Sequence, residues 1–182
     1  MTGAGHSRST NEQDAQYVRA TAALGPALER LARACESDPD HQKDLLQDIH
    51  FAVWRSFSVF DGRCSEATWV YRIAHNVAAS HVLKQKRLRA SGMLTLDQIE
   101  HWPDPAQPDP EAATGERRAI LRLMTLVRAL AVPDRQVVLL YLEGLEAAAI
   151  GEVCGLTPGA VAVKVHRLKA VLSRQFANGG VR

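Results

Sequence analysis

The sequence predicts an all-α protein of two small helical domains joined by a proline-rich linker, the second a four-helix domain with a helix-turn-helix. Ala, Leu, Arg and Glu recur at helical spacing, while alternating β-branched and aromatic runs are scarce, so we expect no strand. Four prolines between residues 101 and 110 remove backbone donors and interrupt the helical pattern. A length of 182 residues with 46% apolar content suits one mid-sized domain or two small ones with buried cores.

The domain boundaries follow from the same patterns. Residues 1–13 are rich in Gly, Ser and Thr without periodicity, which predicts a disordered leader. The first helical domain is then expected at 14–90, the linker at 91–115 and the second domain at 116–178.

The first domain is expected to contain three helices. The first spans about residues 17–35, the second begins near Asp40, and the third spans about 67–88 after a turn-like segment at 60–65. Apolar residues of the second helix fall on one face: Leu45, Ile49, Ala52 and Val53. Asp44 and Asp48, four residues apart, share another face.

The second domain opens with an amphipathic helix that stops before Pro133, with this apolar stripe: Ile120, Leu123, Met124, Val127 and Leu130. Pro133 and Asp134 suit the first turn of a second helix ending near 143–144, because proline needs no amide partner there and Asp favours the positive end of the helix dipole.

A short helix at 145–153, a turn at 154–156 and a last helix to about residue 176 have the helix-turn-helix pattern. Gly155 can take a positive φ in the turn, and Thr157 can cap the last helix. The core face of the last helix carries Val161, Val165, Leu168 and Leu172, and the opposite face carries Gly159, Val163, His166, Arg167 and Ala170. The alternative interpretation is a helical hairpin with a basic, solvated face.

Charge is segregated along the chain, although the net charge is only +2. No acid lies between Glu66 and Asp97, where the bases are Arg72, Lys84, Lys86, Arg87 and Arg89. None follows Glu152, where the bases are Lys164, Arg167, Lys169, Arg174 and Arg182. Two separate basic tracts indicate two contacts with nucleic acid.

Other classes of protein are disfavoured. The three cysteines are far apart and form no C-x-x-C, so we expect reduced thiols and neither a disulfide framework nor a zinc site. No histidine pair meets on one helical face, and no nucleophile or phosphate loop is recognisable, so we expect no enzyme, metal or cofactor. Without a signal peptide or a long apolar stretch, the chain is expected to be soluble and cytoplasmic, with no membrane insertion.

Two stretches resemble the extracytoplasmic-function (ECF) group of bacterial RNA polymerase sigma factors. Residues 44–78, with Asp44-Leu45-Leu46-Gln47-Asp48 and Thr68-Trp69-Val70-Tyr71-Arg72-Ile73-Ala74-His75-Asn76, look like conserved region 2. Residues 133–169, beginning Pro133-Asp134-Arg135-Gln136-Val137-Val138-Leu139-Leu140, are similar to region 4. The resemblance implies a sigma factor that is monomeric when free, with these partners: the beta and beta-prime subunits of core RNA polymerase, promoter DNA and an anti-sigma factor.

The resemblance also implies a docking surface for the polymerase. In relatives, the helix that begins near Asp40 contacts the basic coiled-coil clamp of the beta-prime subunit, which implies these contact residues: Asp44, Gln47, Asp48, Phe51 and Trp54. A different possibility is that Phe51 and Trp54 are core residues.

By the same resemblance, the loop after residue 60 and the helix that follows it melt the duplex and bind the −10 element. The implied residues are Asp61, Arg63, Tyr71, Arg72, His75, Asn76, Lys84, Lys86 and Arg87. A separated strand needs cations for phosphates and flat or apolar surfaces for bases. Trp69 is expected in the core. His75 stands where relatives often carry arginine, so acidification is expected to strengthen its phosphate contact.

The last helix is implied to bind the −35 element through Thr157, Gly159, Ala160, Val163, Lys164, His166, Arg167 and Lys169. Relatives usually have Ser-x-Gly-Thr-Val-Lys-Ser-Arg here, whereas this chain has Thr157-Pro158-Gly159-Ala160-Val161-Ala162-Val163-Lys164. Apolar side chains touch thymine methyls but make no bidentate contact with base edges. We therefore expect readout through shape, methyl groups and phosphates, with salt-sensitive affinity.

The competing hypothesis is a helix-turn-helix regulator that is not a polymerase subunit. It accounts only for the residues after about 116 and leaves the region-2-like stretch unexplained.

Overall fold

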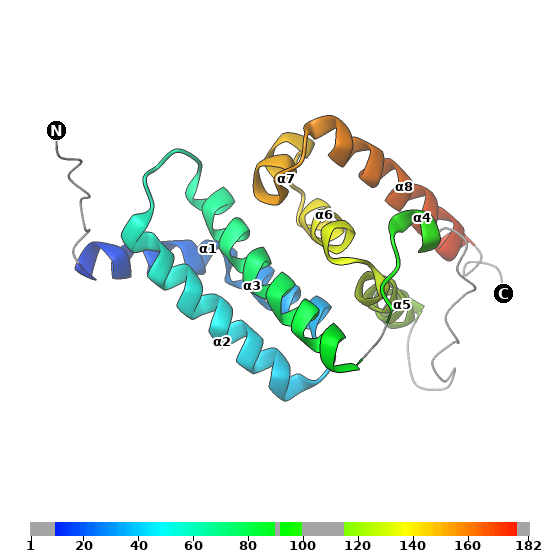
Figure 1. The fold of residues 1–182 in the computed structure, drawn as a ribbon, viewed down its shortest axis with the longest axis horizontal. Coiled ribbons are helices and arrows are strands. Elements are labelled where there is room, and N and C mark those ends of the chain that lie inside the picture. Colours follow the sequence, from blue (N-terminus) through cyan, green and yellow to red (C-terminus); the bar gives the residue numbers. More distant parts are fainter. Residues whose placement is uncertain (1–9, 90–91, 100–114, 178–182) are drawn as a thin grey trace. The chain divides into compact units, whose positions relative to one another are not determined.

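The computed structural model describes residues 10–89, 92–99 and 115–177 (Figure 1). In these ranges the chain forms eight α-helices and one 3-10 turn, and the sole β pairing is an isolated bridge between Leu94 and Leu130. The all-α prediction is confirmed. The chain divides into two compact units, Met1–Lys84 and Gln85–Arg182. Residues 1–9 of the predicted leader and the prolines of the predicted linker, in 100–114, lie outside the described residues.

The first unit is built from α1 (Thr10–Cys35), α2 (Pro39–Ser56), the 3-10 turn η1 (Phe57–Val59) and α3 (Glu66–Arg89), which continues past the unit boundary. Figure 1 shows α2 and α3 running in opposite directions. The Asp38 carboxylate caps α2 by accepting bonds from the amides of Asp40 and His41, both at 3.0 Å. The largest fully buried side chains of this unit are Leu28, Leu45, Ile49, Val53, Phe57 and Val70.

The first helix begins earlier than the sequence predicted. It starts at Thr10 rather than near Tyr17, so assigning residues 10–13 to a disordered leader is wrong. The physical reason is a tertiary contact, because the buried Gln13 donates from Nε2 to the carbonyl oxygen of Trp54 at 2.8 Å. Helix propensity gives no indication of this long-range hydrogen bond.

The second unit contains the predicted helices α5 (Gly115–Ala129), α6 (Val132–Leu142), α7 (Ala147–Cys154) and α8 (Pro158–Ala177). Gly155 ends α7 with φ 69°, as the turn required. The Thr157 hydroxyl accepts the Ala160 amide at 3.2 Å and caps α8. A Cβ on Gly151 would lie 2.5 Å from the carbonyl oxygen of Leu156, so glycine is needed where the turn crosses α7.

A further short helix, α4 (Leu96–Ile99), occupies part of the stretch expected to be linker. Leu94 donates its amide to the Ala129 carbonyl at 2.9 Å and accepts the Ala131 amide at 2.6 Å. Leu96 and Ile99 are each only 2% exposed. Residues 92–99 therefore belong to the packed second unit, and their assignment to the linker is wrong.

No single helix in the described ranges is long and apolar enough to cross a membrane. Helices α7 and α8 meet the length and composition test only when counted together, and they bend by 108° at their junction.

Candidate nucleic-acid interface

One side of α2 carries an exposed stripe of acidic, amide and aromatic side chains, which we call the α2 stripe: Asp44, Gln47, Asp48 and Phe51. Phe51 is 58% exposed and is therefore not a core residue. Trp54, next along this side, is half-buried. Its Nε1 donates to the Asp14 carboxylate at 2.7 Å, and its ring lies 6.1 Å from that of Phe51. The start of α1 thus fixes the aromatic end of the α2 stripe.

The loop between η1 and α3 presents the two predicted charged residues, Asp61 and Arg63, at the surface. They are bonded to each other, because Arg63 Nε lies 2.8 Å from Asp61 Oδ2 and the Arg63 amide donates to Asp61 Oδ1 at 3.1 Å. The loop is anchored by buried Phe60, whose ring centre lies 5.3 Å from that of Trp69. Trp69, half-buried and donating to Ser56 Oγ at 2.9 Å, supports the loop.

The predicted DNA-facing residues of α3 fall into two groups. Asn76, Lys84, Lys86 and Arg87 are exposed, and Arg72 is half-exposed. Tyr71 and His75 are buried, at 8% and 3% exposure, with ring centres 6.3 Å apart. A direct DNA contact by either would first require its exposure, so the structure does not support these two assignments.

The expectation that acidification charges His75 also needs correction. Burial lowers the pKa of His75 to about 4, because the imidazolium would lose its hydration. The imidazole therefore stays neutral at the pH values where an exposed histidine would protonate. The sequence pattern placed His75 correctly within the helix but wrongly on its exposed side.

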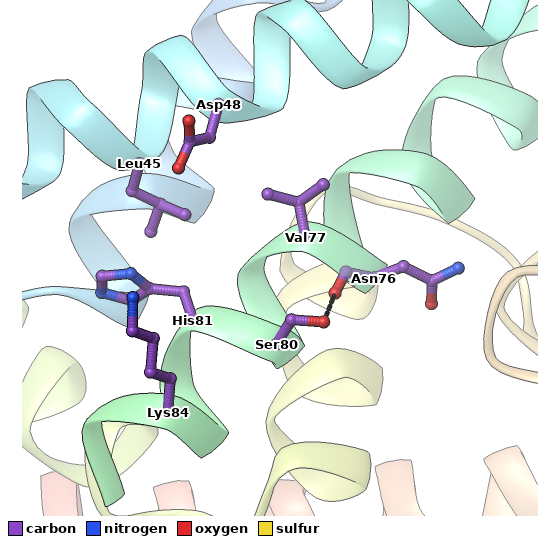
Figure 2. A pocket seen from close by; sticks show the side chains of 7 residues that line it. All are labelled: Leu45, Asp48, Asn76, Val77, Ser80, His81 and Lys84. Atoms are coloured by element: carbon purple, nitrogen blue, oxygen red, sulfur yellow. Dashed lines mark hydrogen bonds between the residues drawn. The ribbon is translucent and has the colours of Figure 1, made fainter. Parts of the chain in front are cut away.

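A groove of about 410 Å³ separates α2 from α3 (Figure 2). It brings together residues predicted for different partners, because Asp48 belongs to the α2 stripe while Asn76 and Lys84 are predicted DNA contacts. Figure 2 shows Asp48 and Leu45 on one wall and His81 and Lys84 on the other. The groove therefore presents both signs of charge over a small apolar floor.

The wall that carries His81 is held by a hydrogen bond to Glu36. His81 Nε2 lies 2.9 Å from Glu36 Oε2, and the Glu36 side chain is only 2% exposed. Burial would raise the pKa of Glu36, but hydrogen bonds from the Asp38 amide, His81 and the Ser37 amide outweigh burial and lower that pKa to about 2. One carboxylate thus joins the end of α1, the start of α2 and the middle of α3.

Helix α8 presents most of its predicted DNA-facing residues at the surface. Those exposed are Thr157, Gly159, Val163, His166, Arg167 and Lys169, while Ala160 is half-exposed. Val163 is 52% exposed, so an apolar side chain lies on the predicted DNA-facing side of α8. The Lys169 ammonium lies 5.5 Å from the centre of the Tyr141 ring.

Two cations of α8 are paired with carboxylates from outside the helix. Lys164 bonds to the buried Asp134 carboxylate, so its assignment as a phosphate contact is not supported by this arrangement. Arg167 Nη1 lies 2.7 Å from Asp97 of α4. The sequence did not predict that Asp134 and Asp97 pair with these two cations. It did contain one local indication of α4. Thr95 and Gln98 form a capping box, in which the Thr95 amide donates to Gln98 Oε1 at 2.9 Å and the Gln98 amide to Thr95 Oγ1 at 3.3 Å.

The metal-ligating side chains and one of the cysteines are further possible sites. In the described parts of the chain, no three His, Cys, Asp or Glu side chains gather as a metal site would require. Burial raises the pKa of Cys154 to about 11, so this thiol is a poor nucleophile.

Comparison with known proteins gives a match in each unit. Residues 21–88 match the sigma-70 region 2 family, and residues 120–172 match sigma-70 region 4. Two solved structures share the fold: CnrH in complex with the cytosolic domain of CnrY, and the sigma factor RpoE in complex with the anti-sigma factor NepR from Bartonella quintana. The first has a TM-score of 0.62 at 20% identity, covering 89% of this chain and 88% of that chain. For the second, the TM-score is 0.64 at 18% identity, covering 88% and 96%.

Sequence relatives are closer. The ECF RNA polymerase sigma factor SigX of Bacillus subtilis is 25% identical over 76% of this chain and 72% of that protein. The ECF RNA polymerase sigma factor SigF of Caulobacter vibrioides is 31% identical over 92% of this chain and 89% of that protein. Since regions 2 and 4 also follow in order, this chain belongs to the extracytoplasmic-function family of RNA polymerase sigma factors.

Proposed function

We propose that this sigma factor docks on core RNA polymerase through the α2 stripe and Trp54. The observation that carries the proposal is the exposure of two carboxylates and Phe51 on one side of α2. Acidic side chains complement a basic surface, such as the beta-prime coiled-coil clamp, and an exposed aromatic ring supplies apolar area at the centre of an interface. Trp54, held by Asp14, is oriented beside that ring.

The loop 61–65 and the exposed part of α3 are proposed to open the promoter and hold the −10 element. Lys84, Lys86 and Arg87 offer charge to the phosphates of a separated strand, and Asn76 offers an amide to a base edge. The Asp61–Arg63 pair gives the loop a defined shape. Because unstacking a base costs a few kcal/mol, such contacts must form as the base leaves the duplex.

Helix α8 is proposed to lie in the major groove at the −35 element. Its exposed Ala162 and Val163 suit thymine methyl groups, while His166, Arg167 and Lys169 suit phosphates. Promoter recognition by this unit therefore depends on shape, methyl contacts and salt-sensitive charge more than on bidentate hydrogen bonds.

An anti-sigma factor is the proposed negative regulator, acting in the cytoplasm where the polymerase works. The proposal rests on the two similar structures, which were solved with CnrY and with the anti-sigma factor NepR. A protein that covers the α2 stripe would compete with the polymerase. In this scheme the chain is a non-catalytic subunit, and the chemistry of RNA synthesis belongs to the core enzyme.

The experiment is reconstitution of the full chain with core polymerase on supercoiled genomic templates, followed by mapping of transcript starts. The double variant Asp44→Asn/Asp48→Asn and the single variant Phe51→Ala should each weaken core binding and reduce initiation at the same start sites. Glu29→Gln, an exposed carboxylate on α1, is the control and should leave both unchanged. Core binding that is unaffected by both α2 variants would refute the docking surface, and the absence of any new start sites would refute promoter recognition.

A further inference from the structure

The segment Gly92–Ile99 lies against the C-terminal DNA-reading helix. Figure 1 shows α4 beside α8. Backbone bonds between Leu94 and the residues around Leu130 attach one end of the segment, and buried Leu96 and Ile99 attach the other. The Leu96 amide also donates to Asp134 Oδ2 at 2.9 Å, in a buried position. The segment is therefore fixed in place before any DNA arrives.

This attachment delivers a carboxylate to the basic side of α8. Asp97 Oδ1 lies 2.7 Å from Arg167 Nη1, and the two side chains are 61% and 44% exposed. Asp134, which holds the Leu96 amide with one oxygen, bonds Lys164 with the other. Two cations in one turn of α8 are thus balanced by carboxylates, and one of these carboxylates comes from α4.

We propose that α4 is an acidic cover that lowers the affinity of α8 for DNA, with Asp97 competing against phosphate for Arg167. The proposal rests on the proposed function of α8 as a DNA-reading helix. An exposed ion pair contributes little to folding, so a phosphate can displace Asp97 from Arg167. The displaced carboxylate stays close to the DNA because α4 remains attached, and its repulsion reduces the gain in affinity.

The cover affects non-specific binding most. Binding to arbitrary sequences depends almost entirely on cations that replace counterions on the phosphates, so each neutralised cation lowers both the affinity and its salt dependence. Contacts of Val163 with thymine methyl groups are not changed by Asp97. A cover of this kind therefore raises the ratio of specific to non-specific binding at the C-terminal unit.

The test uses the full chain and a labelled 30-base-pair duplex of mixed sequence, titrated at several salt concentrations. Asp97→Asn removes the charge and keeps the shape. It should tighten binding about threefold to tenfold at ~0.1 M salt and steepen the slope of log affinity against log salt by about 0.9, the value for one added phosphate contact. Asp97→Glu keeps the charge and should bind like the unmodified chain.

Two further variants make the test specific. Glu146→Gln removes a charge from an exposed position at the start of α7, where the side chain makes no capping bond. Its effect should be clearly smaller than that of Asp97→Asn. In a double-mutant cycle, Asp97→Asn should have no effect when Arg167 is already Gln, because the cation that the carboxylate covers is missing.

Unchanged or weaker binding by Asp97→Asn overturns the proposal, as does an equal gain with Glu146→Gln or a gain that persists in Arg167→Gln. These outcomes are separate from the proposed function. Transcription with core polymerase tests promoter recognition directly, and a chain that initiates normally while Asp97→Asn has no effect on duplex binding retains its function without the cover.

Discussion

The basic tracts of α3 and α8 look alike in the sequence and differ in the folded chain. Lys84, Lys86 and Arg87 at the end of α3 are exposed, and no carboxylate in the described part of the chain pairs with them. On α8, Lys164 and Arg167 are paired with Asp134 and Asp97. A stretch of sequence without acids can therefore still have its cations paired, because the carboxylates that pair with them come from distant positions in the sequence.

The largest effect is expected from a variant that weakens the contact holding α3 in place. Glu36→Gln should lower the free energy of unfolding of the first unit by about 3 kcal/mol at neutral pH, because the buried Glu36 carboxylate accepts hydrogen bonds from the Ser37 amide, the Asp38 amide and His81. The Glu36 pKa falls on folding from 4.5 to about 2, so this stabilisation is fully present above pH 4.5 and is lost as the pH falls toward 2. Chemical denaturation across this pH range measures the difference between variant and unmodified chain.

The control for this prediction is Glu29→Gln on the same helix. Glu29 pairs with Arg33 at 3.7 Å, but both side chains are 57% exposed, so its removal should leave stability nearly unchanged. An equal loss in the two variants would contradict the role given to Glu36.

A second variant disturbs the turn that positions α8. Gly151→Ala places a Cβ 2.5 Å from the backbone oxygen of Leu156 and should destabilise the second unit by about 2 kcal/mol, since the turn between α7 and α8 has to shift. The matched change Gly159→Ala meets nothing within 4 Å and should be neutral or slightly stabilising. Hydrogen exchange of the α7 and α8 amides would reveal the difference, and equal behaviour of the two alanine variants would rule out the close contact.

The third prediction sharpens the contrast between the tracts. Lys86→Gln/Arg87→Gln should reduce the salt slope for binding a single-stranded oligonucleotide by about 1.4, corresponding to about 0.7 for each of two phosphate contacts. Lys43→Gln removes a cation from α2 that is already paired with Asp40 at 2.9 Å, and serves as the control. A salt slope that does not change in the double variant would show that the strand does not contact this end of α3.

The smallest expected effects concern the starts of the two helices, which are capped alike. Ser65 Oγ accepts the Thr68 amide at 3.0 Å before α3, and Thr157 Oγ1 accepts the Ala160 amide at 3.2 Å before α8. Ser65→Ala and Thr157→Ala should each cost about 1 kcal/mol of unfolding free energy in urea titrations. Ser173→Ala, at an exposed position inside α8, should cost less than either; if it does not, the caps are not what stabilises these helix starts.

The sequence predicted the fold well wherever a repeating pattern carried the information. Apolar spacing located the helices of both units, and Gly155 and Thr157 marked the helix-turn-helix because turn and cap chemistry is local. The start of α1 was missed because it depends on a contact between Gln13 and Trp54, distant in the sequence. Helix α4 was missed because four residues are too short for periodicity, although its capping box was visible.

The candidate site was predictable by position along the helices but not by exposure. The α2 stripe follows from the spacing of its members, whereas the burial of Tyr71 and His75 depends on what packs around α3. The pairing of Arg167 with Asp97 was equally invisible, because it requires α4 to lie on α8. Helical spacing assigns residues to sides of a helix, and tertiary packing decides which side stays open.

The attachment of residues 92–99 to the second unit changes what the proline-rich stretch connects. Residues 100–114 then connect α4 to α5, two helices of the same unit, while only residues 90 and 91 separate the end of α3 from the attached segment. An insertion within residues 100–114 would therefore lengthen a connection inside the second unit, whereas an insertion after Arg89 would fall between α3 and the attached segment.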